Sequence, residues 1–222
     1  MISQASKGRA PMKSVNRQSV RIPVKSLSSE RYSTQGFLYG YSETAIILSN
    51  MDTNDQTEWD GVVEGLVADT AMILTYDYPQ QQDDQSPILQ QAISFVCAAG
   101  AKNVILVGAS RGGVASIKVA AHSPVDPRLV GVVALSAPIE YEGKVFYSKE
   151  ELGRIKIPKL LINSEHDDGA SDTREMFQLF EEPKEMLFYP GDAHGTQLFA
   201  RDQQSITTKL QDFVAVVSGR VS

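Results

Sequence analysis

The sequence predicts an α/β fold with a mostly parallel central sheet and helices on both faces. Short continuous apolar runs, which are typical of strands buried on both faces, recur along the chain. Segments with apolar residues at helical spacing separate them. Alternating strands and helices imply right-handed βαβ crossovers and therefore parallel neighbours. The 222 residues, 42% of them hydrophobic, suffice for one large core, so we expect a single domain over residues 18–222.

The N-terminal part differs from the rest of the chain in charge. Residues 1–29 contain six basic side chains and no acidic one, although the whole chain has a net charge of −6. We expect residues 1–17 to form a disordered basic leader. Their serine-rich, acid-poor composition also resembles an organelle transit peptide, but a strand expected from about Gln18 leaves little to remove.

The expected strands follow in chain order. Residues 19–25 alternate apolar and polar side chains, and residues 35–41 follow after a serine-rich turn, so the sheet opens with an antiparallel strand pair at its N-terminal edge. Six apolar runs then predict buried strands, at residues 45–51, 71–76, 104–108, 129–135, 160–162 and 186–189.

Helices are predicted between these strands and after the last of them. Residues 58–67 and 203–217 carry apolar side chains at helical spacing. Ser86 and Pro87 supply an N-cap and a first-turn proline for a helix over residues 88–99.

A G-x-S-x-G pattern occupies residues 108–112, where an expected strand runs into an expected helix. At such a turn, a serine between two glycines is held in a strained backbone conformation, with its hydroxyl projecting above the sheet. Ser110 is therefore the candidate nucleophile.

Two further strands end in polar loops that contain an acid and a histidine. One precedes residues 164–168, which read Ser-Glu-His-Asp-Asp, and the other precedes residues 190–195, which read Pro-Gly-Asp-Ala-His-Gly. In an open parallel sheet, catalytic groups collect at the carboxyl ends of the strands. With serine, acid and histidine in this order, the chain from about Gln18 onward resembles the α/β-hydrolase family, in particular its dienelactone-hydrolase-like and carboxylesterase branches. The resemblance implies an α/β-hydrolase fold and a serine hydrolase without cofactor or metal.

Larger members of that family insert a helical cap over the site, and residues 136–158 are the corresponding segment. Ser148 and Glu151 have the spacing of a capping box, which predicts one short helix there. We therefore expect no large cap.

A serine hydroxyl attacks efficiently only when a base takes its proton, and histidine suits that task near neutral pH. We assign the base to His194. The alternatives are His122, at the end of the helix that follows Ser110, and His166, which we expect to face solvent or line the site entrance.

A carboxylate is expected to orient the base and stabilise its imidazolium form. By the family's spacing, the acid comes four residues after the residue that closes the strand, here Asn163, which selects Asp167. Asp168 is the next candidate, and Glu165 lies in the same loop. Asp192 is close to the histidine but is expected to bond local backbone.

An acyl-transfer site also needs two backbone N–H groups for the oxyanion. The resemblance assigns one to Arg111, after the nucleophile, and the other to the loop that follows Leu48. Many relatives have His-Gly in that loop, whereas this chain has Ser-Asn-Met-Asp at residues 49–52. We predict Met51 as the donor, with the Asn50 and Asp52 amides as alternatives.

The side chains beside this region have several readings. Arg111 either binds a substrate carboxylate or pairs with a nearby acid such as Asp77. The carboxylate of Asp52 would be unfavourable beside an oxyanion unless it is directed away. Tyr76 and Tyr78 either line the pocket or pack in the core.

The predicted function is hydrolysis of a small-molecule carboxylic ester through an acyl-serine intermediate. A peptidase or thioesterase with the same triad is one alternative, and a non-catalytic binding protein is another. An acidic body argues against a nucleic-acid substrate, and no apolar stretch is long enough to span a membrane. The single cysteine, Cys97, fits a reducing compartment, so we expect a cytoplasmic protein.

Overall fold

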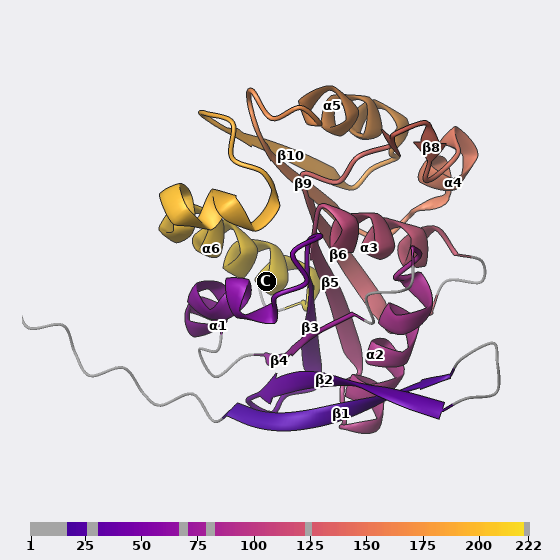
Figure 1. Cartoon of the computed structure of the whole chain (residues 1–222), viewed down its shortest axis with the longest axis vertical. Helices are drawn as coiled ribbons and strands as arrows, with labels where there is room; N and C mark the ends of the chain where they lie inside the picture. Colours follow the sequence, from indigo (N-terminus) through magenta and orange to yellow (C-terminus); the bar gives the residue numbers. More distant parts are fainter. Residues whose placement is uncertain (1–16, 26–30, 67–70, 79–82, 123–125, 220–222) are drawn as a thin grey trace, which may run out of the picture.

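Within the described residues of the computed structural model, eight strands form one twisted sheet in the order β1-β2-β4-β3-β5-β6-β9-β10 (Figure 1). The description covers residues 17–25, 31–66, 71–78, 83–122 and 126–219. β1 pairs with β2 and β2 with β4 in antiparallel fashion, and the other neighbours are parallel. The strands span Arg17–Lys25 (β1), Arg31–Tyr39 (β2), Thr44–Ser49 (β3), Met72–Tyr76 (β4), Asn103–Ala109 (β5), Leu129–Leu135 (β6), Lys159–Ser164 (β9) and Lys184–Tyr189 (β10).

This topology confirms the mostly parallel sheet with an antiparallel pair at its N-terminal edge. Of the predicted leader over residues 1–17, only Arg17 is described, and it is the first residue of β1; residues 1–16 lie outside the described residues.

Helices cover both faces of the sheet (Figure 1). The first face carries α2 (Ser86–Ala98), α3 (Arg111–Ala121), α4 (Lys149–Arg154) and α5 (Ala170–Leu179). The second carries η1 (Gln56–Trp59), α1 (Asp60–Leu66) and α6 (Leu198–Val217), with the short η2 (Gly195–Gln197) before α6.

Alternate residues of the central strands supply the two cores. In β3, Ala45 and Ile47 pack with the first face, while Ile46 and Leu48 pack with the second. All four are fully buried, as the continuous apolar run predicts. Because burying a large apolar side chain is worth about 1.5–3 kcal/mol, these strands form a stable base for the loops at their carboxyl ends.

The structure corrects some predicted boundaries. The helix expected from residue 88 begins at Ser86, so the N-cap is Gln85 and not Ser86. The physical reason is that the Asp84 carboxylate accepts hydrogen bonds from both the amide and the hydroxyl of Ser86, which lets the helix start earlier. The helix expected over residues 58–67 is divided into η1 and α1.

The segment between β6 and β9 contains the predicted short helix and no large cap. The capping box of Ser148 and Glu151 is present at the start of α4. A small hairpin of β7 (Glu140–Tyr141) and β8 (Lys144–Val145) precedes it. The hairpin was not predicted, because its strands have two residues each and are exposed, so they carry no apolar pattern. Among the described residues, no helix has both the length and the apolar character needed to cross a membrane.

Candidate active site

Ser110 lies between β5 and α3 with φ of +49° and ψ of −113°, a conformation that is costly for any residue except glycine. The glycines on both sides are sterically required. A Cβ on Gly108 would overlap the backbone of Gly112, and a Cβ on Gly112 would overlap the carbonyl group of Ser49. The elbow therefore brings α3 into backbone contact with the ends of β5 and β3.

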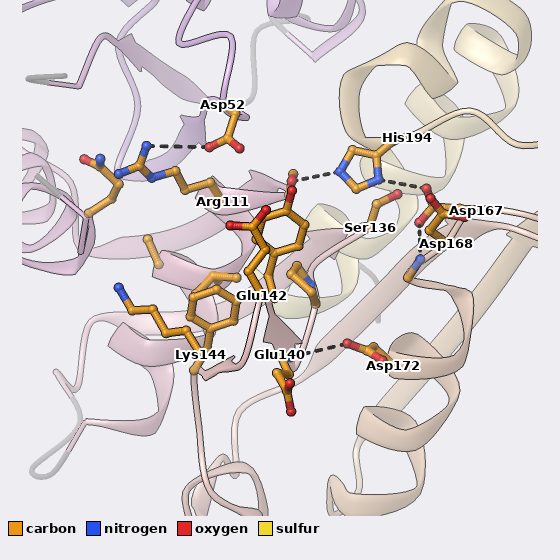
Figure 2. A pocket seen from close by; sticks show the side chains of 18 of the residues that line it. Asp52, Arg111, Ser136, Glu140, Glu142, Lys144, Asp167, Asp168, Asp172 and His194 are labelled. Atoms are coloured by element: carbon orange, nitrogen blue, oxygen red, sulfur yellow. Dashed lines mark hydrogen bonds and ion pairs between the residues drawn. The ribbon is translucent and has the colours of Figure 1, made fainter. Parts of the chain in front are cut away.

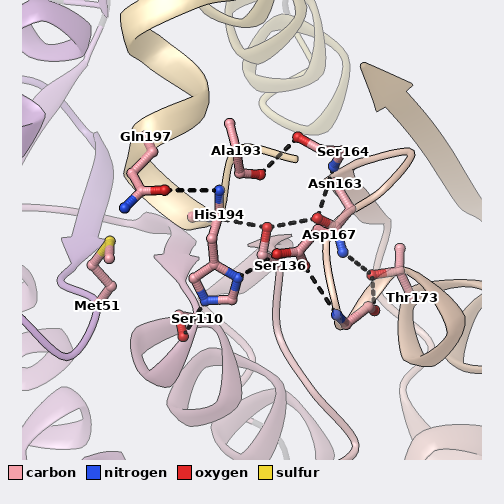
Figure 3. A network of polar contacts seen from close by, with 12 residues as sticks. Met51, Ser110, Ser136, Asn163, Ser164, Asp167, Thr173, Ala193, His194 and Gln197 are labelled. Carbon is pink, nitrogen blue, oxygen red and sulfur yellow. Dashed lines mark hydrogen bonds and ion pairs between the residues drawn. The ribbon is translucent and has the colours of Figure 1, made fainter. Parts of the chain in front are cut away.

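Three predicted site residues form one hydrogen-bonded chain (Figure 3). Nε2 of His194 lies 2.8 Å from the hydroxyl of Ser110, and Nδ1 lies 2.8 Å from Oδ1 of Asp167. The residues follow β5, β9 and β10, whose carboxyl ends share one edge of the sheet. Since a carboxylate only accepts, the proton of a neutral His194 sits on Nδ1, and Nε2 accepts from the Ser110 hydroxyl.

The environments of Asp167 and His194 differ. Burial alone raises the pKa of Asp167, but hydrogen bonding and charge interaction with His194 outweigh it, so the pKa lies below its usual range and the carboxyl is ionised near neutral pH. The hydrogen bond to Asp167 raises the pKa of His194, partly against burial. The His194 side chain is 35% exposed and that of Asp167 is 4% exposed, so the imidazole is partly open to solvent and the carboxylate is not.

The other candidates for acid and base lie elsewhere. Glu165 and Asp168 are exposed, and it is Asp167 whose oxygen meets the His194 ring. His166 is exposed and lines the pocket. His122 is the exposed C-cap residue of α3.

The loop after β3 packs against the histidine loop. Sδ of Met51 lies 2.8 Å from the hydroxyl of Thr196, two residues after His194. The side chain of Asn50 is fully engaged in the core, because it donates to the carbonyl of Tyr76 and accepts from the indole N–H of Trp59. Arg111 is the first residue of α3, so its N–H has no acceptor within the helix.

The side chain of Arg111 pairs with a nearby acid, which is one of the two alternatives given above, and that acid is Asp52 rather than Asp77, the example named there. The guanidinium lies 3.5 Å from the Asp52 carboxylate (Figure 2). The ion pair therefore directs the negative charge of Asp52 toward Arg111. Asp77 instead accepts from the side-chain amide of Gln56 at 2.8 Å. The sequence could not distinguish the two acids, since each follows a neighbouring strand. Tyr76 is fully buried, and its hydroxyl lies 3.0 Å from that of Ser49.

Ser136, which sequence reasoning missed, lies between the acid and histidine loops. It follows β6 with φ of +49° and is 1% exposed. Its hydroxyl accepts from the N–H of Gly195 at 3.0 Å and donates to Oδ1 of Asn163 at 2.7 Å (Figure 3). Nothing in the sequence distinguishes this serine from others, because its partners lie 27 and 59 residues away.

A pocket of about 990 Å³ opens above Ser110 and His194, between the hairpin, the start of α3 and the acid loop (Figure 2). Its lining includes three cationic side chains, each paired with a carboxylate: Arg111 with Asp52 at 3.5 Å, Lys118 with Asp84 at 3.0 Å and Lys144 with Asp83 at 3.6 Å. The remaining acidic residues of the lining are Glu140, Glu142, Asp167, Asp168, Asp172 and Asp192. The pocket wall is therefore strongly acidic.

In the part of the chain that the structure describes, no group of three or more His, Cys, Asp or Glu side chains is arranged to hold a metal ion. Cys97, on α2, is partly buried, and burial raises the pKa of its thiol.

Comparison with known proteins identifies the fold through structure alone, since no family model and no curated protein matches the sequence. The esterase domain of a Rhodothermus marinus protein has a TM-score of 0.70 at 16% identity, over 88% of this chain and 97% of that domain. The α/β hydrolase GrgF from Penicillium has a TM-score of 0.71 at 16% identity, over 90% and 98%. A Paleococcus ferrophilus monoacylglycerol lipase has a TM-score of 0.70 at 15% identity, over 84% and 100%.

Proposed function

Because this chain has the α/β-hydrolase fold, we propose that it is a serine hydrolase that cleaves a carboxylic ester through an acyl-serine intermediate. The observation that carries the proposal is the hydrogen-bonded chain from Ser110 through His194 to Asp167, which ends at a pocket of about 990 Å³. These residues are the nucleophile, the base and the orienting acid.

In the proposed reaction, Oγ of Ser110 attacks the ester carbonyl carbon while its proton passes to Nε2 of His194. The tetrahedral intermediate collapses to the acyl-serine, and the imidazolium returns the proton to the departing alcohol. Water, deprotonated by Nε2 of His194, then attacks the acyl carbon. The second tetrahedral intermediate breaks its bond to Oγ of Ser110, which takes the proton back from the imidazolium, and the carboxylic acid is released. Asp167 holds the reactive tautomer and stabilises the imidazolium throughout.

The negative oxygen of each tetrahedral intermediate needs donors that are in place beforehand. We assign them to the backbone N–H groups of Arg111 and Met51. Removing one such donor typically costs about 10²–10³ in kcat. The Arg111 assignment is supported by its position at the first turn of α3, where helix amides lack helical acceptors.

The substrate class is an inference from the site and from the neighbours. Two of the similar structures are described as an esterase domain and a monoacylglycerol lipase, which act on esters, and this favours an ester over a peptide or thioester. A peptidase and a thioesterase would use the same intermediate and differ only in the leaving group. A binding protein would have no use for a serine held at φ of +49° against a histidine.

Hydrolysis of p-nitrophenyl esters from acetate to decanoate tests the proposal. We expect turnover by the wild type and by Ser94→Ala, whose serine is on the exposed side of α2, and loss of turnover in Ser110→Ala. A fluorophosphonate probe should label the wild type and Ser94→Ala but not Ser110→Ala. Equal turnover by Ser110→Ala and wild type would refute the proposal, and so would a wild type that neither hydrolyses any ester nor reacts with the probe.

A further inference from the structure

Two buried serine hydroxyls hold the backbone on either side of His194 (Figure 3). Oγ of Ser164 donates to the carbonyl of Ala193 at 2.7 Å, and Oγ of Ser136 accepts from the N–H of Gly195 at 3.0 Å. Ser164 is fully buried and Ser136 is 1% exposed. The residues before and after the proposed base are therefore each fixed by a hydroxyl from a different strand end.

Asn163 links the two serines. Its Oδ1 accepts from the N–H of Ser164 at 2.7 Å, and since a backbone N–H only donates, this atom is the amide oxygen. The same oxygen accepts from the hydroxyl of Ser136 at 2.7 Å. Ser136 therefore has a definite role at each atom, with its hydrogen directed to Asn163 and a lone pair directed to Gly195.

The amide nitrogen of Asn163 extends the network toward the acid. Nδ2 donates to the hydroxyl of Thr173 at 2.9 Å, and that hydroxyl donates to the carbonyl of Gly169 at 3.3 Å. The N–H of Gly169 in turn donates to Oδ2 of Asp167 at 3.2 Å. One set of buried polar contacts therefore supports both partners of the His194–Asp167 hydrogen bond.

The histidine loop needs such support because its backbone includes residues of high conformational freedom. Gly191 has φ of +103° and Gly195 has φ of +56°, so glycines lie on both sides of His194. The N–H and the carbonyl of His194 bond to Gln197, which belongs to the same short segment. The residues directly before and after the histidine are held by Ser164 and Ser136. Farther from the histidine, the carbonyl of Gly191 accepts from the N–H of His166, and the hydroxyl of Thr196 donates to the carboxylate of Glu58.

We propose that Ser136 and Ser164 are positioning residues, which hold the backbone of the histidine loop so that the imidazole spans Ser110 and Asp167. This inference rests on the proposed function, because it assigns the two hydroxyls to the proposed base. Neither residue takes part in bond making. Both act indirectly, by keeping the ring nitrogens of His194 at 2.8 Å from Ser110 and from Asp167.

Ser136→Ala and Ser164→Ala test the proposal in the full chain. Alanine has the same Cβ as serine, so the first variant keeps the backbone at φ of +49° without new strain while it removes the acceptor of Gly195. We expect kcat for a p-nitrophenyl ester to fall about 10- to 100-fold with KM within about 2-fold, because a misplaced catalytic group costs rate rather than binding.

Thr75→Val is the matched control. Thr75 is fully buried, and its hydroxyl donates to Oε1 of Gln56 at 2.9 Å, on a strand that carries none of the proposed catalytic residues. This variant also loses one buried hydrogen bond, so its thermal unfolding should shift about as much as that of the serine variants. Its kcat should stay within about 2-fold of wild type. Should one serine variant fail to fold, the other tests the proposal alone.

Two readouts separate positioning from a general loss of stability. The acidic limb of the kcat/KM profile should move to lower pH in the serine variants, because a weaker contact with Asp167 no longer stabilises the imidazolium. In proton NMR, the low-field resonance of the His194 Nδ1–H, assigned by its loss in His194→Ala, should shift or broaden. The NMR readout needs no ester turnover, so it remains informative if the proposed function fails. If the serine variants matched Thr75→Val in kcat, in the pH of the acidic limb and in the His194 resonance, the positioning role would be overturned.

Discussion

The carboxylate of Asp52 lies 3.5 Å from the guanidinium of Arg111, and this ion pair connects the loop after β3 to the first residue of α3. These two segments carry the proposed oxyanion donors, the amides of Met51 and Arg111. The ion pair between the side chains thus lies next to the two backbone N–H groups that are proposed to bind the oxyanion.

We expect Asp52→Asn and Arg111→Gln each to lower kcat about 2- to 5-fold. The Asp52 side chain is 73% exposed, so the coupling between the two residues should stay within about 0.2–1 kcal/mol and weaken with salt. A double-mutant cycle on kcat at low and high ionic strength measures it. A coupling of zero at low salt would mean that the pair does not support the two donors.

The pH dependence of ester hydrolysis should follow His194. The base works only when neutral, and the hydrogen bond to Asp167 raises the pKa of His194, so activity should be lost as the pH falls through a value above the ordinary 6.5. Asp167→Asn removes the main cause of the shift. The acidic limb of kcat/KM should move to lower pH, and kcat should fall about 10³- to 10⁴-fold.

Asp168→Asn is the control for that assignment, since it makes the same change at the adjacent, exposed residue. Its kcat should remain within a few-fold of wild type, with a small downward move of the acidic limb because the charge of Asp168 also raises the pKa of His194. If Asp168→Asn lost activity and Asp167→Asn kept it, Asp168 would be the acid.

Replacing the elbow glycine should damage the fold itself. A Cβ at residue 112 would overlap the Ser49 carbonyl group, so Gly112→Ala should lower the free energy of unfolding by at least about 1–3 kcal/mol. Gly153 on α4 has no neighbour closer than 4.0 Å to an added Cβ, and Gly153→Ala should be neutral or stabilising by up to about 1 kcal/mol. Urea unfolding of both variants measures the difference, and equal stabilities would contradict the steric account.

The acidic wall of the pocket should select among esters by charge. For acetate esters of matched size, kcat/KM should be highest with a cationic alcohol and lowest with an anionic one, and the difference should shrink as salt is added. The double variant Glu140→Gln, Glu142→Gln, on the exposed hairpin, should reduce the preference. A preference that is unchanged by salt and by this variant would have to come from shape and not from charge.

The order of strands and helices along the chain and a few short motifs made most of the fold, and three side chains that meet at its site, predictable. The G-x-S-x-G pattern indicates Ser110, and the order and spacing of the resembled family indicate Asp167 and His194, each after a further strand whose carboxyl end lies at the same edge of the sheet. The structure joins these three residues by hydrogen bonds.

The parts that were missed depend on contacts between loops. The acid that pairs with Arg111 was not identified, because loop geometry, which decides between Asp52 and Asp77, leaves no periodic pattern. Ser136 was not singled out, because its importance lies in partners from two distant loops. The β7–β8 hairpin is held by backbone pairing of exposed residues, which a search for apolar runs does not detect.

The short connection between β6 and β9 bears on whether a movement of the chain limits the rate of turnover. Tyr147, Leu152 and Ile155 anchor this segment in the core, where each is at most 4% exposed. A segment fixed in this way does not have to swing aside before an ester enters or an acid leaves, so its own motion should not limit the reaction cycle. Changes at the reacting groups should then appear in kcat without being masked by a movement of this segment.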